Sequence, residues 1–189
     1  MIDATNFAGW VWPVPITNGR KPVVSHEFEG GNRYLPSGAL NYATHLGLDL
    51  MFPRVPTDPT GPATDVAIPK HGGNPGWITW PGTLVRAAGP GKIWAAKRTA
   101  LGLSIELDHG KVGGVGMLTF YQHMIAFARG WQHGDEVQAG DVLGTMGGDP
   151  SNDPHLRHLH FEVWLPDGKS NVGDWPVDPQ PYVNVWAQS

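Results

Sequence analysis

Apolar and polar positions alternate in the segment RHLHFEVWL at 157–165. The even-numbered residues from His158 to Trp164 are mostly polar, and the odd-numbered residues from Leu159 to Leu165 are apolar. A period of two predicts a half-buried strand. Side chains two residues apart leave a strand on the same side, about 6–7 Å apart, so His158 and His160 can serve one site. The alternative is a pair of surface histidines on the wet side of a sheet.

A second alternating segment is THLGLDLMF at 44–52, where leucines alternate with His45, Gly47 and Asp49. On a fully extended strand, residues i and i+4 lie about 13 Å apart, which is too far for both to bind one metal ion. If His45 and Asp49 share an ion, the chain must therefore bend between them. Gly47 at the midpoint permits such a bend. A solvated strand face is the alternative.

Short apolar segments recur along the rest of the chain, and Gly or Pro separates most of them. This pattern is typical of a mostly β domain, an antiparallel sandwich or barrel. The segments are KPVVSHEF (21–28), TLVRAAG (83–89), GKIWAAKR (91–98), LSIELDH (103–109), MLTFYQHM (117–124) and DVLGTMG (141–147).

Between these strands, residues 53–82 are dense in Pro, Gly and Thr, which predicts a long irregular loop. We expect short helical turns within FYQHMIAFARGW (120–131) and near the tail VDPQPYVNVWAQS (177–189). The chain is interpreted as a single domain over 1–189, with its core at about 22–185 and the loop as an insertion.

Composition narrows the function. The 189 residues carry a formal net charge of −4 with no basic run, which disfavours a nucleic-acid partner. No apolar run is long enough to span a membrane, and the first 15 residues lack the basic and apolar regions of a secretory signal peptide. With no Cys, a metal must be held by His, Asp or Glu, and nine His are present.

The two alternating segments together offer imidazoles and one carboxylate, a set that suits Zn²⁺. Catalytic zinc keeps three protein ligands and an open position for water. The chain has more histidines in these motifs than three ligands require, and an extra imidazole suits proton transfer. The spacing alone does not distinguish His158 from His160 as the ligand.

From about Trp10 to Tyr182 the sequence resembles the lysostaphin-type, or LytM-like, zinc endopeptidases of bacterial peptidoglycan. The motifs that carry the resemblance follow one another in the family's order. They are WVWPVP, the H-x-G-x-D motif in THLGLDL, the strand pair TLVRAAGPGKI, SIELDHG, the Y-x-H element in TFYQHM, the hairpin WQHGDEVQAGDVLGTMG, the H-x-H motif in HLHFEV, and VDPQPYV. Departures are the long loop after Asp49 and the acidic insertion in HEFEGGNR.

The resemblance implies the groove-bearing lysostaphin-type fold and a zinc-dependent endopeptidase that cuts cross-links or stem peptides of peptidoglycan. It implies one Zn²⁺ held by His45, Asp49 and His160, with His123 and His158 assisting attack by zinc-bound water. Their acid and base roles stay undivided. Glycyl bridges and D-Ala–diaminopimelate links are both cut within the family.

Two other functions are weighed. A non-catalytic peptidoglycan-binding or regulatory module on the same fold usually loses some site residues, whereas all five are filled here. Residues 134–148, GDEVQAGDVLGTMGG, also resemble half of a lipoyl or biotinyl carrier domain, but the modifiable Lys is absent. The enzyme is expected to act on the cell wall, outside the cytoplasm. We expect it to be delivered by a phage particle or injection system, released by lysis, or exported by another route.

The other polar and aromatic residues are mostly expected to have structural roles in the core, in loops or on the surface. Glu162 is predicted to be a surface carboxylate, with a hydrogen bond to an imidazole as the alternative, and His109 is predicted to be structural or to line the groove. The remaining histidines, His26, His71, His133 and His155, are expected in exposed loops. The core is expected to contain Trp10, Trp12 and Trp94, and loop residues Trp77 and Trp80 are candidates for stacking on a glycan or peptide.

Overall fold

The computed structural model describes residues 2–29, 45–67, 76–146, 154–166 and 175–188. Strands dominate these ranges, beside one short helix, α1 (Gln180–Val183), and the 3-10 turns Ala4–Phe7 and Pro154–Leu156. The predicted mostly β class is confirmed. The prediction of a helical turn at 120–131 is wrong, because that segment contains the end of strand β8 (Val115–Met124) and strand β9 (Ala126–Phe127). The helix α1 lies in the tail, as predicted. Across the described ranges, no helix combines the length and apolar character needed to cross a bilayer.

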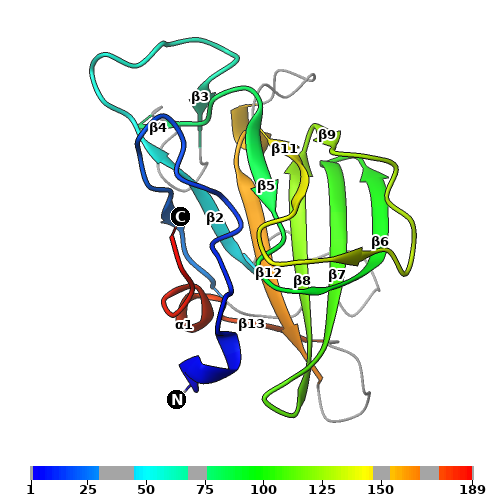
Figure 1. The fold of residues 1–189 in the computed structure, drawn as a ribbon. Helices are drawn as coiled ribbons and strands as arrows, with labels where there is room; N and C mark the ends of the chain where they lie inside the picture. Colours follow the sequence, from blue (N-terminus) through cyan, green and yellow to red (C-terminus); the bar gives the residue numbers. More distant parts are fainter. Residues whose placement is uncertain (1, 30–44, 68–75, 147–153, 167–174, 189) are drawn as a thin grey trace.

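The strands form two antiparallel sheets, one large and one small (Figure 1). The large sheet has the order β10 (Glu136–Val137), β6 (Gly91–Thr99), β7 (Gly102–Val112), β8 (Val115–Met124), β12 (Leu159–Leu165), β2 (Leu48–Pro53), β4 (Trp77–Ile78) and β3 (Asp65–Val66). Two further strands join it, β1 (Val23–His26) beside β2 and β13 (Trp175–Val177) beside β12. The small sheet has the order β5 (Thr83–Arg86), β11 (Val142–Met146) and β9 (Ala126–Phe127).

The inserted segment 53–82 is more regular than its composition predicts. It contains β3 and β4, which extend the edge of the large sheet beyond β2 (Figure 1). Arg54 fixes the segment by pairing with the Asp65 carboxylate and donating to the Pro59 carbonyl at 2.6 Å. Trp77 packs on the buried pair Met51 and Val66, and Trp80 lies 4.9 Å from Phe52 between ring centroids. Both rings are thus engaged with the protein. Residues 68–75, which include His71, lie outside the described ranges.

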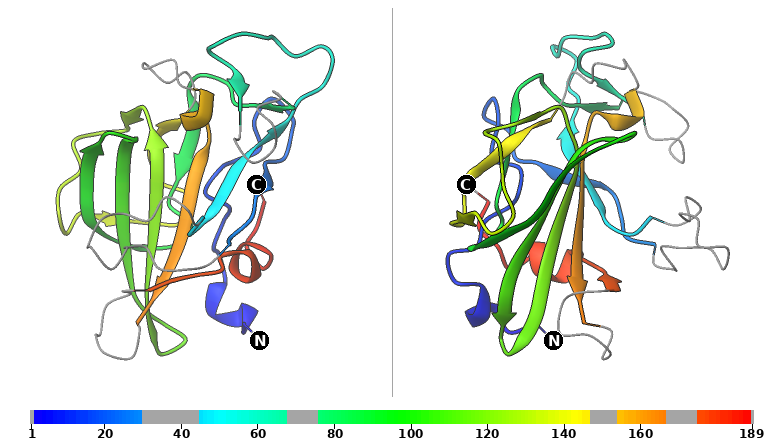
Figure 2. Two further views of the ribbon diagram at one scale, coloured as in Figure 1. Left: turned by 180° about the vertical axis from the view of Figure 1, so that it is seen from behind. Right: turned by 90° about the vertical axis from the view of Figure 1, so that its right-hand side faces the viewer.

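The core fills one face of the large sheet. The small sheet, the N-terminal segment and α1 all lie on this side (Figure 2). Phe161 and Tyr121 of adjacent strands meet edge to face at 5.3 Å, and Phe161 reaches Trp186 at 5.8 Å. Trp12 ties the two ends of the chain together, since its Nε1 donates to the Val183 carbonyl at 2.8 Å. The core therefore does not occupy the opposite face of the large sheet.

The predicted core position of Trp10 and Trp12 is confirmed, because both rings are buried. The prediction for Trp94 is wrong, because its side chain is 45% exposed and meets His133 edge to face at 5.1 Å. Trp94 lies where the register of β6 against β7 shifts, between Ile93 and Ala95, so the simple alternation fails there.

His109 belongs to a hydrogen-bonded chain that crosses the core side of the sheet. Its Nδ1–H donates to the Pro90 carbonyl at 2.7 Å, and its Nε2 lies 2.8 Å from the Thr119 hydroxyl. That hydroxyl lies 3.0 Å from the Tyr121 hydroxyl, which accepts from the Ala88 N–H at 2.9 Å. Burial lowers the pKa of His109 to about 4. The ring is thus neutral at pH 7 and structural, one of the two roles expected for it.

This pKa predicts acid sensitivity. A histidine in the unfolded chain has a pKa of about 6.5. Between pH 6.5 and 4 the unfolded state therefore binds a proton that the folded state excludes, and the free energy of unfolding falls as the pH falls. The loss attributable to His109 reaches up to about 3 kcal/mol. Denaturant unfolding of wild type and His109→Gln at pH 7 and pH 4 measures it. The variant should lose less stability than wild type, and equal losses would contradict the assignment.

Candidate metal centre

The two alternating segments meet at the β2–β12 pair. In the register of this pair, His160 lies opposite Asp49 and Leu159 lies opposite Leu50. Opposed residues project from the same face of a sheet. The leucines face the core, so His160 and Asp49 share the other face, as their parity predicts.

A bend at Gly47 brings His45 to the same place. Strand β2 begins only at Leu48, and the chain turns at Gly47 before it. His45 Nε2 consequently lies 2.9 Å from Asp49 Oδ1. On an extended strand, the Cα atoms of these two residues would lie about 13 Å apart. Gly47 is needed because a Cβ there would lie 2.4 Å from the Phe161 carbonyl oxygen and 3.0 Å from His160 Cε1.

Three candidate ligand atoms form a triangle. His45 Nε2 lies 2.9 Å from Asp49 Oδ1 and 3.0 Å from His160 Nδ1, and Asp49 Oδ1 lies 3.1 Å from His160 Nδ1. Zinc bonds of about 2.0–2.2 Å place tetrahedral ligand atoms about 3.3–3.6 Å apart. A small outward movement of the three side chains would accommodate such an ion, so the residues present fit a zinc site.

The outer contacts of the two imidazoles select the nitrogens that face inward. His45 Nδ1–H donates to the Glu27 carbonyl at 2.7 Å, which leaves Nε2 for an ion. His160 Nε2 lies 2.9 Å from Glu162 Oε1, which leaves Nδ1. Such outer partners fix the tautomer and the orientation of ligating histidines. The prediction of a surface Glu162 is wrong, because this carboxylate is buried and also accepts from Trp164 Nε1 at 2.5 Å.

Electrostatics at this cluster favour the charged forms of the acid and of one imidazole. Burial opposes the ionised form of Asp49, but His158 and then His160 and His26 outweigh it and hold the pKa of Asp49 well below its usual value. Burial likewise opposes a charge on His160, but hydrogen bonds with Asp49 and Glu162 raise the pKa of His160 to about 9. The polypeptide therefore holds a positive charge at the position where the triangle would hold a cation.

His158 and His123 lie beside the triangle. His158 Nε2 is 3.1 Å from Asp49 Oδ1, and its buried Nδ1 has no hydrogen-bond partner in the described part of the chain. The His123 ring lies 4.7 Å from that of His158 and 6.0 Å from that of His160. Burial, reinforced by the charges of His158 and His160, keeps the pKa of His123 well below its usual value. Its Nδ1–H donates to the Leu101 carbonyl at 2.8 Å, so Nε2 is the unprotonated nitrogen.

A β-bulge delivers His123 to this group. The register of β7 against β8 shifts by one residue between Leu103 and Ile105, so that Gln122 and His123 both lie opposite Ser104. His123 has a φ of 68°, in the left-handed region that non-glycine residues seldom adopt. Bulges re-aim side chains next to functional sites. The structure thus brings together all five predicted site residues.

The sequence prediction missed His26. It was expected in an exposed loop, but it lies on β1 with its Nδ1 3.3 Å from Asp49 Oδ2. Its ring stacks on that of His45 at a centroid distance of 4.0 Å, and His26, His45 and Asp49 each offer a ligand atom within 4.8 Å of the others. The sequence feature that could have located His26 was the predicted strand at 21–28, because this strand includes it. By contrast, His133 and His155 are exposed, as expected.

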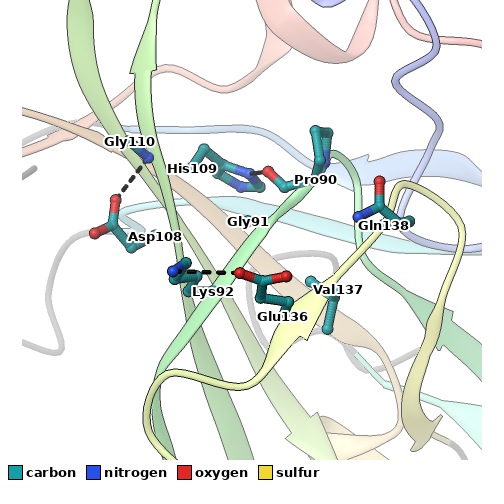
Figure 3. Close-up of a pocket in the computed structure, with 9 residues that line it drawn as sticks. All are labelled: Pro90, Gly91, Lys92, Asp108, His109, Gly110, Glu136, Val137 and Gln138. Carbon is teal, nitrogen blue, oxygen red and sulfur yellow. Dashed lines mark hydrogen bonds and ion pairs between the residues drawn. The ribbon is translucent and has the colours of Figure 1, made fainter.

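Two pockets lie near histidines of the large sheet. A small one, of about 40 Å³, is lined by His123 together with Arg98, Leu101, Gly102, Met124, Ile125 and Leu156. The other, of about 390 Å³, surrounds His109 and the ion pair between Lys92 and Glu136, whose atoms are 3.3 Å apart (Figure 3). None of the five predicted site residues lines the larger pocket, so that pocket is separate from the predicted site.

Comparison with known proteins gives a family match and one curated relative. Residues 77–179 match the sequence profile described as Peptidase family M23. The L-Ala–D-Glu endopeptidase of Bacillus subtilis (strain 168) is 28% identical over 72 residues, which are 35% of this chain and 21% of the relative. The chain thus spans well under two thirds of that protein.

Solved structures share the fold. Csd3 of Helicobacter pylori aligns with a TM-score of 0.53 and 21% identity over 96% of this chain and 37% of its own. A zinc-containing peptidase from Vibrio cholerae aligns with a TM-score of 0.51 and 17% identity over 89% of this chain and 39% of its own.

Replacing Gly47 with Ala should disrupt the triangle. The added Cβ would collide with the Phe161 carbonyl, and we expect the free energy of unfolding to fall by about 1–3 kcal/mol and zinc affinity to fall with it. Gly76→Ala is a matched control, because a Cβ there meets no atom within 4 Å. Denaturant unfolding of metal-free protein and zinc titration test the pair. Equal behaviour of the two variants would show that the bend tolerates a side chain.

The left-handed backbone at His123 predicts an unusual order of stability. His123→Gly should be more stable than His123→Ala by about 1 kcal/mol, because only Gly adopts this conformation without strain. At His158, which is not among the residues with positive φ, the order should reverse. Thermal unfolding of the four variants measures both differences. The same order at both positions would refute a strained His123.

Proposed function

The chain belongs to peptidase family M23, and from that premise we propose that it is a zinc-dependent endopeptidase that hydrolyses peptide cross-links or stem peptides of bacterial peptidoglycan. The observation that carries the proposal is the triangle of His45 Nε2, Asp49 Oδ1 and His160 Nδ1, with sides of 2.9–3.1 Å. The outer contacts to Glu27 and Glu162 support these three residues as the zinc ligands.

The other residues of the cluster would supply proton transfer. A bound zinc ion lowers the pKa of a coordinated water and polarises a scissile carbonyl. His123 is neutral at pH 7 and its Nδ1–H is held by Leu101, so its Nε2 is suited to accept a proton as general base. We assign His158, beside Asp49 and His123, as the hydrogen-bond donor to the developing oxyanion or the leaving amine.

The substrate assignment rests on the family and on the curated relative. That relative is named for an L-Ala–D-Glu bond, so we choose a stem peptide containing such a bond over a glycyl bridge. Peptidoglycan peptides are then the partners, and the cell wall is where the protein acts. We retain residues 1–189 as one peptidase unit, delivered by a phage particle or injection system, by lysis or by export. The complete set of five site residues disfavours a non-catalytic binding module.

Metal removal and a ligand substitution test the proposal together. Purified protein should contain about one zinc ion per chain by mass spectrometry. Chelation should abolish digestion of defined muropeptides, and added zinc should restore it. His45→Ala should lower zinc affinity by more than about 100-fold, because a direct ligand matters more than its outer partners. His133→Ala, which alters an exposed ring, is the control. Full hydrolysis by metal-free protein would refute the mechanism, and the masses of the products identify the bond.

A further inference from the structure

His26 lies beside Asp49 and stacks on His45, with its Nδ1 3.3 Å from Asp49 Oδ2. We propose that His26 is a positioning residue of the metal centre, whose Nδ1–H holds Asp49 Oδ2 so that Oδ1 alone faces the ion. This inference rests on the proposed zinc-dependent function. It adds a residue that the family motifs in the sequence do not contain.

The two oxygens of Asp49 have different surroundings. Oδ1 lies within 2.9–3.1 Å of three imidazole nitrogens, those of His45, His158 and His160. Oδ2 lies 3.3 Å from His26 Nδ1. Asp49 is only 4% exposed, so water has little access to Oδ2. A buried carboxylate oxygen without a donor is costly, and His26 supplies that donor.

The backbone places His26 there by a second bulge. The register of β1 against β2 shifts between Val24, opposite Leu50, and His26, opposite Asp49. Without this shift, His26 would share the parity of Val24 and point away from the carboxylate. Ser25 fixes the bulge, because its hydroxyl donates to the Asp49 carbonyl at 2.9 Å.

The side chain of His26 is held on its other sides as well. Its ring lies nearly parallel to that of His45, with 2° between the planes. Its Nε2 lies 3.5 Å from Glu29 Oε1, while Glu29 Oε2 accepts from the His45 N–H at 3.2 Å. Glu29 therefore links the positioning histidine to the backbone of a candidate ligand. A ring constrained in this way is suited to orient Asp49.

The geometry favours a positioning role over direct ligation. His26 Nδ1 is directed at Oδ2, whereas the triangle is built on Oδ1. Holding Oδ2 prevents Asp49 from binding an ion through both oxygens, which keeps one coordination position open for water. A fourth protein ligand would close that position, as in structural zinc sites.

The test compares His26→Ala, His26→Gln and the exposed-ring control His133→Ala. Zinc affinity is measured by competition with a chromogenic chelator, and cobalt is substituted to read the coordination number from its visible absorption. We expect His26→Ala to lose about 10–100-fold in zinc affinity, as is typical for outer partners of metal ligands. Its cobalt absorption should weaken, because Asp49 then binds through both oxygens. The amide N–H of His26→Gln should restore most of the affinity, and His133→Ala should match wild type.

Other results would overturn the inference. Wild-type affinity and cobalt absorption in His26→Ala would show that Asp49 needs no positioning, even if the metal-free protein unfolds at a lower temperature. Loss of zinc as complete as in His45→Ala, without rescue by His26→Gln, would show that His26 is itself a ligand. A wild-type chain that binds no zinc would overturn the proposed function and this inference with it, so the two failures are distinguishable.

Discussion

The buried carboxylate of Asp49 is the constraint on which the site depends. Four imidazoles, those of His26, His45, His158 and His160, lie within 3.3 Å of its oxygens. An isolated buried charge is very costly, so the carboxylate requires these partners. The imidazole nitrogens in turn lie close together. Their lone pairs would repel one another unless protons or a cation lay between them. A divalent ion satisfies both requirements with one charge centre, and this is why the cluster is suited to zinc.

The fold separates this polar cluster from the core with a single sheet. Leucines of β2 and Phe161 of β12 fill one face, and the residues between them carry the candidate ligands on the other. Because the register of the β2–β12 pair fixes both faces at once, hydrophobic burial also fixes the position of Asp49 opposite His160. A slip of one residue would exchange the faces, so the core and the site are specified together.

Departures from regular strand geometry complete the site. The bend at Gly47 returns His45 toward its own strand, and bulges in β8 and β1 turn His123 and His26 toward Asp49. Regular alternation would leave these three side chains too distant or on the wrong face. The left-handed backbone of His123 shows that such a bulge costs conformational free energy. The strands on either side maintain this conformation.

The alternation of residues determined much by itself: the strands around 48–52 and 159–165, the face that each histidine takes on them, and the need for a bend at Gly47. These follow from local periodicity, because burial on one face imposes a period of two. The order of the motifs along the chain additionally indicated the protein family. Only the tertiary structure decided that Glu162 is buried against His160, that His26 reaches Asp49 and that Trp94 is exposed. Each depends on a neighbouring strand or on a register shift, and these arise from pairing between segments distant in sequence, which local periodicity does not encode.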